Sequence, residues 1–489
     1  MSGKNTTTKI AKSGLWLTAS YAISRVAQLI AQICLARLLS PEDFGVWAMV
    51  LVVTILTDLF QDNATAAVLI QRGLEDKKLV DAVYSLGVNI SIFMFVVQAL
   101  IGLPISWFFQ QPVLFPLIAC VSFKFVINAG TGTRAAILQR QMKFREIAIS
   151  NIGNGIARMC GTLILAAFGF GVWSFAGGEI CKAIVDAALK RLYCRYDCTY
   201  HFFPDQQAVR EVWSFTSSLI GINLAVYANT NGDNFLIGKL LGAQSLGFYN
   251  LAYQLAMLPA FALSQINKIN FSVLSQRDDE GKKSYLRQML EYYALFYAPI
   301  YSLGFVVAPW IIPLVYGSQW LGAVPIFQIV LIFAYARGFM SILGTTLNAL
   351  NQPRTNAVIN LALVPLSLPS FFIGAKLGGT VGVAIAVAIV MGIGATIWFW
   401  FATCRAAKWN VATLASPVIL PTVAAIFSAG IVIFSTASLT LQMQIVLQPL
   451  LVILINAFLV SILSKGRVPR KVLKLIKETL ISKTKSVKT

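Results

Sequence analysis

Two parts of this chain are related to each other across about two hundred residues. Residues 68–78 carry the pattern Val-Leu-x-Gln-Arg-x-x-Glu-x-Lys-Lys, and residues 273–283 carry it again at an offset of 205. Residues 37–45 and 239–247 form a second related pair at an offset of 202. A duplicated membrane chain folds into two related halves, and its binding site usually lies where the halves meet.

The chain is 489 residues long, and 57% of them are hydrophobic while only 12% are charged. A bilayer core about 30 Å thick needs roughly 20 apolar helical residues to cross it. The sequence predicts an all-α polytopic membrane protein, because barrel strands would be shorter and would alternate. About 14 transmembrane helices are expected, at residues 13–38, 44–70, 80–107, 113–139, 146–168, 172–193, 211–237, 246–274, 286–313, 321–350, 355–375, 380–404, 412–435 and 445–463.

The basic residues are unevenly placed along the chain, whose formal net charge is +20. Lysines and arginines gather in alternate loops, such as residues 140–145, whereas the intervening loops 40–43 and 242–245 contain none. This is the positive-inside pattern, and it puts both termini in the cytoplasm. Arg37, Lys239 and Lys376 are exceptions. The charge placement therefore indicates a membrane protein and does not indicate a nucleic-acid partner.

Each repeat contains six predicted spans, so both repeats have the same orientation in the membrane. We predict two parallel six-helix lobes around a central cavity, followed by two extra C-terminal helices. The predicted divisions are an N-terminal lobe at 1–205, a C-terminal lobe at 206–408, the helix pair at 409–464 and a basic cytoplasmic tail at 465–489.

Polar residues inside membrane spans usually face an interior. Span one carries four of them at spacings of 4, 3 and 4, which share an arc of about 60° on a helix. Span seven carries four more at the same positions plus 202. Matched stripes favour a shared cavity over hydrogen bonding within one lobe, which is the alternative. The stripes are Tyr21, Arg25, Gln28 and Gln32, then Asn223, Tyr227, Thr230 and Asn234.

Cations outnumber acids within the spans, and an arginine fork suits phosphate oxygens. A wet cavity with several such groups would attract an anion such as a diphosphate. The predicted diphosphate-binding residues are Arg25, Arg134, Arg158, Lys268 and Arg337, and Lys124 also lies within a span. The acids Asp58, Asp62 and Asp233 are interpreted either as counter-ions or as sites for a coupling H⁺ or Na⁺.

Two other groups have simpler interpretations. Glu179, Lys182 and Asp186 are spaced as a local ion-pair ladder on span six. Cys194, Cys198 and His201 could hold zinc, but a fourth ligand is missing from the pattern. Neither a phosphate-binding loop nor a Ser-His-Asp arrangement occurs, so no enzyme and no resident cofactor is predicted.

Several motifs resemble the polysaccharide transporter branch of the multidrug/oligosaccharidyl-lipid/polysaccharide (MOP) flippase superfamily. They include Ala-Arg-Leu-Leu-Ser-Pro-Glu-Asp-Phe-Gly at 36–45, Leu-Ile-Gln-Arg at 69–72 and Leu-Gln-Arg-Gln-Met-Lys-Phe-Arg at 138–145. The most specific is Asp-Asn-Phe-Leu-Ile-Gly-Lys-Leu-Leu-Gly at 233–242, followed by Leu-Gly-Phe-Tyr at 246–249. The likeness spans about residues 10–405 and is greatest to Wzx-type flippases of the colanic acid and lipopolysaccharide exporter group.

This resemblance implies a flippase that moves undecaprenyl-diphosphate-linked oligosaccharide units across the bacterial cytoplasmic (inner) membrane by alternating access. The product would feed exopolysaccharide, capsule or O-antigen assembly, with membrane lipids, a polysaccharide polymerase and chain-length machinery as partners. Sugar hydroxyls are then expected to contact Tyr21, Gln28, Gln32, Asn223 and Asn234.

Three alternatives remain open on sequence alone. One is an ion-coupled multidrug or metabolite exporter of the same superfamily, although cationic drugs would favour an acidic cavity. Another is a membrane polysaccharide polymerase or ligase, which the short outer loops disfavour. The third is a non-transporting scaffold derived from a flippase.

Overall fold

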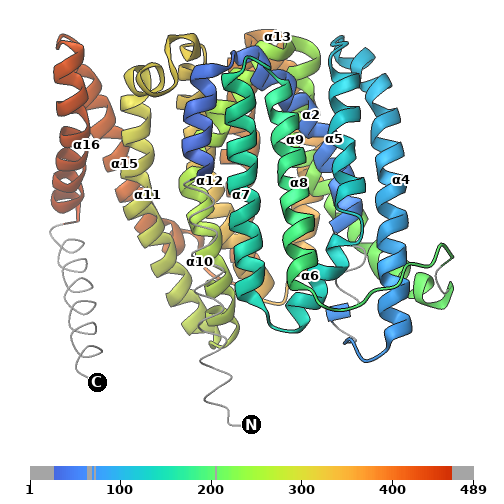
Figure 1. Cartoon of the computed structure of the whole chain (residues 1–489). Helices are drawn as coiled ribbons and strands as arrows, with labels where there is room; N and C mark the ends of the chain where they lie inside the picture. The colour runs from blue at the N-terminus through green and yellow to red at the C-terminus, as the bar shows by residue number, and fades with distance from the viewer. Residues whose placement is uncertain (1–26, 63–68, 71–72, 204–205, 465–489) are drawn as a thin grey trace, which may run out of the picture. The chain divides into compact units, whose positions relative to one another are not determined.

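The computed structural model describes residues 27–62, 69–70, 73–203 and 206–464, and every regular element in these ranges is a helix (Figure 1). An apolar helix at Ala27–Leu38 comes first. The remaining helices are α2 (Pro41–Asp62), α4 (Lys77–Phe109), α5 (Leu114–Ile127), α6 (Thr131–Arg140), α7 (Phe144–Ala167), α8 (Trp173–Tyr193), α9 (Gln206–Ala256), α10 (Leu258–Ser275), α11 (Asp279–Tyr316), η1 (Ser318–Trp320), α12 (Ala323–Ala349), α13 (Pro353–Ala386), η2 (Val387–Gly394), α14 (Ala395–Ala407), α15 (Val411–Thr436) and α16 (Leu441–Leu463).

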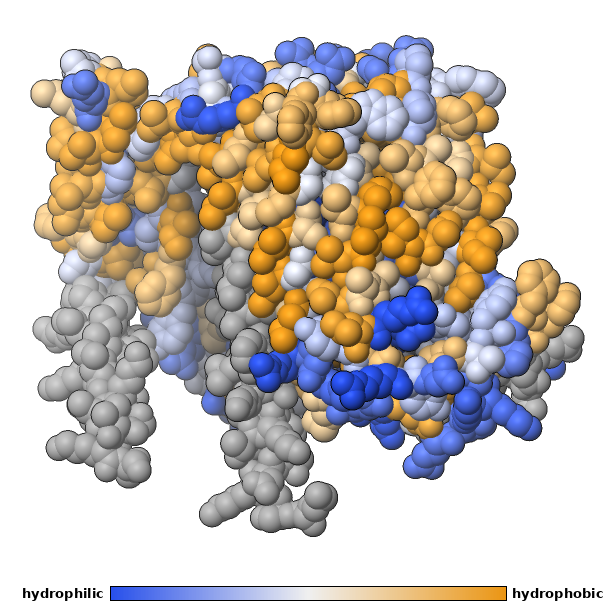
Figure 2. All heavy atoms as spheres, in the orientation of Figure 1, coloured by the Kyte–Doolittle hydropathy of each residue, from blue (hydrophilic) through white to orange (hydrophobic). Residues whose placement is uncertain are grey.

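Within the described ranges, six helices are long and apolar enough to cross a membrane, or seven if the bent α5–α6 pair forms one span. Helices occupy the described parts of all the predicted stretches, and the full count of spans stays a prediction. Figure 2 shows apolar side chains gathered over the middle of α4, α7 and α8, with polar side chains toward their ends. This distribution is that of a multi-pass membrane protein.

Glycines set the breaks between several helices. Gly130, between α5 and α6, has a φ of 73° in the left-handed region, and the two helices meet at a bend of 45°. Gly242 has a φ of 83° inside α9, which divides it into two segments. Glycine adopts these angles without the steric cost of a Cβ atom. The α9 break falls between predicted spans seven and eight.

The chain divides into two compact units that do not coincide with the predicted lobes. The first unit is residues 1–250 with 315–319, and the second is residues 251–314 with 320–489. The first unit therefore includes most of α9, although the sequence repeat assigns α9 to the second half. The lobe boundaries stay a prediction.

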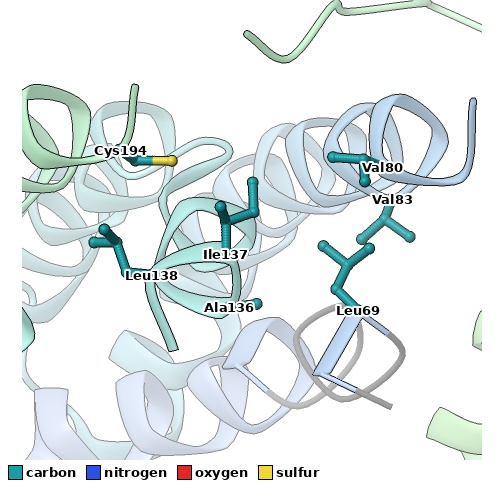
Figure 3. Packing of buried hydrophobic residues seen from close by; sticks show 7 residues of the cluster. All are labelled: Leu69, Val80, Val83, Ala136, Ile137, Leu138 and Cys194. Carbon is teal, nitrogen blue, oxygen red and sulfur yellow. The ribbon is translucent and has the colours of Figure 1, made fainter. Parts of the chain in front are cut away.

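In the first unit, α4, α6 and the segment after α8 share an apolar core. The buried residues of this core are Leu69, Val80, Val83, Ala136, Ile137, Leu138 and Cys194 (Figure 3).

Asp76 caps the start of α4 by accepting hydrogen bonds from the backbone N–H groups of Lys78 and Leu79 at 2.9 and 3.4 Å. Such a cap satisfies N–H groups that would otherwise lack partners at a helix start.

The start of α2 and the second segment of α9 cross with their backbones almost in contact. A Cβ atom on Gly45 would lie 1.7 Å from the carbonyl oxygen of Ala243, and one on Gly247 would lie 1.8 Å from that of Pro41. Both pairs are related by the 202-residue offset, because Gly45 matches Gly247 and Pro41 matches Ala243. The contact is therefore reciprocal, as at a two-fold axis.

A second reciprocal contact explains two of the exceptional cations. Arg37 donates its Nε–H to the carbonyl of Val315 at 2.8 Å, and Lys239 donates to that of Phe108 at 2.5 Å. Val315 and Phe108 are each the second-last residue of their helices, α11 and α4. A cation at a helix C-terminus neutralises the dipole and satisfies a free carbonyl. Each repeat thus supplies the cation that caps a helix of the other.

In the second unit, polar bonds fix the two C-terminal helices to α11. Trp310 of α11 donates its indole N–H to Gln448 of α16 at 2.8 Å, and Gln448 donates to Thr436 of α15 at 3.0 Å. Val306, Val432 and Val452 form a buried apolar cluster beside these bonds. The α15–α16 pair is therefore an integral part of the second unit.

We predict that Gly45→Ala and Gly247→Ala each lower the free energy of unfolding by about 1–3 kcal/mol, because the new methyl group must displace a backbone carbonyl. Thermal unfolding in detergent measures the effect. The matched control is Gly430→Ala in α15, where a Cβ atom meets nothing within 4 Å. Equal melting temperatures for all three variants would contradict the close approach.

Candidate functional site

Charged side chains from four helices of the first unit form a cluster. Lys124 of α5 contacts Asp58 of α2 at 2.5 Å. Glu179 of α8 contacts Arg158 of α7 at 2.9 Å and Lys182 of its own helix at 3.2 Å. Helix α5 packs against α8, so the two sets come from neighbouring helices and form one cluster.

Arg158 and Lys182 lie well inside their helices, whereas Lys124 lies in the last turn of α5, beside the bend that joins α5 to α6. Arg158 is nine residues before the end of α7, and Lys124 is ten residues after the start of the bent α5–α6 pair, which corresponds to about 14–15 Å of helix. Glu179 and Lys124 are buried. Moving a single charge to such a depth is costly, and pairing with an opposite charge recovers part of that cost.

Cations outnumber carboxylates among the described members of this cluster. Lys124, Arg158 and Lys182 carry three positive charges against two negative charges on Asp58 and Glu179. The Arg158 and Lys182 side chains are 36% and 44% exposed. Both share the one carboxylate of Glu179. The surplus charge is therefore accessible, and an anion is the ligand that it favours.

The bond from Arg158 to Glu179 uses Nε of the guanidinium group. The Arg158 side chain is 36% exposed, so solvent reaches part of it. A guanidinium group presents five N–H donors in a planar fork, which can contact a carboxylate on one edge and a phosphate on another.

The other predicted diphosphate residues are described only in part. Arg134 of α6 lies over the Tyr84 ring of α4, 5.5 Å from its centre. Arg337 of α12 lies 5.7 Å from the Phe333 ring centre in the second unit. Lys268 belongs to α10, but its side chain lies outside the described residues, as does all of Arg25.

The predicted sugar-contacting residues are only partly described. Gln32 Nε2 and Asn234 Oδ1 are buried and find no hydrogen-bond partner within the described part of the chain. Gln28 is exposed, and only the backbone of Asn223 is described. Tyr21 lies outside the described residues.

The three predicted acids have different surroundings. Asp58 binds Lys124. Asp233 is buried and accepts a hydrogen bond from the Tyr249 hydroxyl at 2.6 Å, across the break in α9. The side chain of Asp62 lies outside the described residues. Whether any of them binds a coupling ion stays a prediction.

The predicted ladder on α8 is only partly formed. Glu179 binds Lys182 as expected, but it also binds Arg158 on the neighbouring helix. Asp186 pairs instead with Lys190 at 2.9 Å and accepts a bond from Asn154 of α7 at 2.7 Å. Glu179 and Lys182 therefore belong to the charged cluster, which sequence analysis missed.

One signal could have revealed this pairing. Only a short connection joins α7 and α8, so residues at similar distances from it lie opposite each other. Arg158 is nine residues before the end of α7, and Glu179 is six residues after the start of α8.

The segment after α8 shows no metal-binding geometry. Cys194 is buried in the apolar core of Figure 3, whereas His201 is exposed. Among the described residues, no three or more His, Cys, Asp or Glu side chains come together as a metal site would require.

The sequence profile of one protein family matches residues 34–325, which is more than half of the chain. That family is described as "Polysaccharide biosynthesis protein". The chain belongs to the polysaccharide biosynthesis protein family.

Relatives of this polysaccharide biosynthesis protein carry related names. It is 25% identical to the lipopolysaccharide biosynthesis protein WzxC of Escherichia coli over 364 residues, which is 73% of each chain. It is 26% identical to the succinoglycan biosynthesis transport protein ExoT of Rhizobium meliloti over 365 residues, or 73% of this chain and 72% of that one. The recognised resemblance to polysaccharide transporters is confirmed.

The fold of this family member also has solved counterparts. It matches the lipid II flippase MurJ in an inward closed conformation with a TM-score of 0.77 and 14% identity, over 93% of this chain and all of that one (100%). It matches an inward-facing MATE transporter of the MOP superfamily with a TM-score of 0.66 and 14% identity, over 80% and 96%. These likenesses show that the chain shares the helical fold of these two proteins.

We predict slow alkylation of Cys198. Burial raises the pKa of its thiol to about 11; Arg134 opposes this shift, while Cys194, Asp81 and Asp197 add to it. Only the thiolate reacts, so the rate should rise about tenfold per pH unit from 7 to 10. Quantitative mass spectrometry of the Cys198 peptide after iodoacetamide treatment measures this rate. A rate that levels off below pH 9 would contradict the raised pKa.

Proposed function

We propose that this protein is a flippase for oligosaccharide units carried on undecaprenyl diphosphate, acting in the bacterial cytoplasmic membrane with both termini in the cytoplasm. Units turned outward would feed surface polysaccharide assembly by a polymerase and its chain-length machinery. Transport requires no covalent change in the substrate, so the protein acts as a transporter and not as an enzyme.

The observation that carries this proposal is the accessible surplus of positive charge at mid-depth in the first unit. A diphosphate is the part of such a substrate that crosses a membrane at the greatest electrostatic cost. Arg158 and Lys182 offer it charge-assisted hydrogen bonds at that depth. The names of the polysaccharide relatives and the likeness to a lipid II flippase support the same substrate class.

Glu179 acts in this proposal as a counter-ion that the substrate replaces. Without substrate it neutralises Arg158 and Lys182, which keeps the empty site from burying unpaired cations. When the diphosphate arrives, the guanidinium and ammonium groups turn toward it. Arg25, Arg134, Lys268 and Arg337 are proposed to hold the diphosphate at other stages of its passage.

Sugar hydroxyls are proposed to contact Tyr21, Gln28, Gln32, Asn223 and Asn234. The buried polar atoms of Gln32 and Asn234, without partners among the described residues, support this role. A buried amide group without a hydrogen bond is costly, and a sugar hydroxyl would remove that cost.

Alternating access would expose the site to each side of the membrane in turn. In this cycle, the reciprocal crossing of α2 with the second segment of α9 closes the side predicted to face outward, and it opens to release the sugar. Asp58, Asp62 and Asp233 are the proposed sites for any coupling H⁺ or Na⁺.

The test is a flipping assay in proteoliposomes that contain the purified chain and undecaprenyl-diphosphate oligosaccharide. A sugar-modifying enzyme added outside reports exposure. We expect Arg158→Gln to slow flipping more than tenfold, because the diphosphate loses its charged fork. Lys190→Gln is the matched control, since it breaks the Lys190–Asp186 pair on α8 outside the cluster.

A double variant separates binding from folding. Arg158→Gln with Glu179→Gln removes both partners of the pair. Only Lys182 then loses its carboxylate, and because its side chain is 44% exposed, no lone charge stays buried and the protein should fold normally. We expect it to remain inactive. Full flipping by this double variant would show that Arg158 only neutralises Glu179, and it would contradict the proposal. Protein-dependent export of cationic drugs without flipping would favour the multidrug alternative.

A further inference from the structure

The segment that follows α8 joins the two sequence repeats, and its first part is fastened along α4. Tyr196 donates its hydroxyl hydrogen to the carbonyl of Leu74 at 3.4 Å, just before α4 begins. The Thr199 N–H donates to Asp81 at 2.9 Å and the His201 N–H donates to Ser85 Oγ at 2.9 Å. Figure 1 shows this segment running from the end of α8 to α4.

The last bonds of this series are formed by Asn89. The Tyr200 hydroxyl donates to Asn89 Oδ1 at 2.8 Å, and Asn89 Nδ2 donates to the carbonyl of Phe202 at 3.1 Å. Asp81, Ser85 and Asn89 are four residues apart and therefore share one face of α4, rising about 6 Å at each step. Two residues of extended chain cover about the same length. Because these two lengths agree, every second linker residue lies beside the next turn of α4.

Beyond these bonds the segment presents aromatic rings to its surroundings. Phe202 is 68% exposed and Phe203 is 86% exposed. Their rings form an edge-to-face pair with centres 4.9 Å apart. Because the backbone is tied to α4 at Phe202, the rings are held at a fixed height along that helix.

That height matches the boundary of the membrane. α4 has 33 residues, or about 50 Å of helix, which exceeds the bilayer core of about 30 Å. Trp107 is exposed near the far end of α4, where an interfacial aromatic residue belongs. Counting back roughly 20 residues, the length of a span, from Trp107 reaches the turn that contains Asn89.

The residues on either side of this turn agree with the assignment. After Asn89, the exposed face of α4 is apolar, with Ile92, Phe93, Val96 and Leu100. Toward the start of the helix, Lys77 and Lys78 are exposed, and so is Arg195 in the linker. Aromatic side chains are favoured where apolar chains meet polar headgroups, and cations are favoured just outside.

We propose that Tyr200, Phe202 and Phe203 form an anchor in the lipid bilayer, seated at the boundary between headgroups and acyl chains on the side of the basic loops. The partner is the membrane surface. The linker up to Phe203 then moves with α4 as one body. This inference depends on the membrane location and not on the substrate.

The test places the photoreactive residue p-benzoylphenylalanine at Phe203 of the full-length chain in phosphatidylethanolamine/phosphatidylglycerol vesicles. On illumination its ketone adds to a nearby C–H bond with no atoms lost, so the adduct mass identifies the partner. We expect the adduct to increase the mass of the protein by that of one phospholipid. Phe93, exposed on the middle of α4, is the positive control, and Glu280, exposed before the spanning part of α11, is the aqueous control.

Asn89→Leu provides a second measurement, because it removes both bonds that hold Tyr200 and Phe202. The lipid adduct at Phe203 should fall several-fold while the adduct at Phe93 is unchanged. No lipid adduct at Phe203 when Phe93 gives one, or an adduct with another protein, would overturn the proposal. An adduct at Phe203 unaffected by Asn89→Leu would overturn the role of α4 in holding the anchor.

Discussion

The first unit depends on the close approach of two backbones where α2 crosses the second segment of α9. Without a side chain at Gly45 and Gly247, each helix rests against a carbonyl of the other. Small residues permit this contact in a membrane, where dispersion between helices replaces the hydrophobic effect as the source of cohesion. The duplication of the sequence therefore produces the same glycine–carbonyl contact twice, once with the glycine of each repeat. Arg37 and Lys239 strengthen the same region by capping helices reciprocally.

Much of this arrangement could be predicted from the sequence. Length and apolarity predict the helices, and the loop predicted at residues 242–245 matches the break at Gly242 in α9, because these are properties of local sequence. The 202-residue offset identifies the pairs that make reciprocal contacts in the structure. The positive-inside pattern even marked Arg37 and Lys239 as exceptions, although their partners could not be foreseen. Those partners are backbone carbonyls far away in the sequence, which no side-chain pattern encodes.

The charged cluster was predicted less completely. The sequence predicts Arg158 as a cation inside a span, but it also predicts that Glu179, Lys182 and Asp186 form an ion-pair ladder on their own helix. Which partner a carboxylate finds depends on the rotation of neighbouring helices, and spacing along one helix does not fix that rotation. Lys124 was noticed without its partner for the same reason. The surplus of one positive charge emerges only when all four helices are placed.

The charged cluster and the linker anchor have different proposed roles within the first unit, one in binding and one in positioning α4. Mid-depth charges suit the part of a substrate that the membrane rejects, while interfacial aromatic rings keep α4 at a fixed level. If α4 keeps a fixed depth in the membrane, the helices that move during transport move relative to α4. The crossing at Gly45 and Gly247 would then supply the closed side of the cycle.

The most direct measurement is flipping with this crossing locked. Cysteines replace Glu42 and Gln244, two exposed residues adjacent to Pro41 and Ala243, and a short cleavable thiol cross-linker joins them. Each single-cysteine variant, treated identically, controls for reaction at native cysteines. The account predicts that flipping of undecaprenyl-diphosphate oligosaccharide stops in the cross-linked protein and returns when the linker is cleaved. Undiminished flipping with the crossing locked would contradict alternating access through this protein.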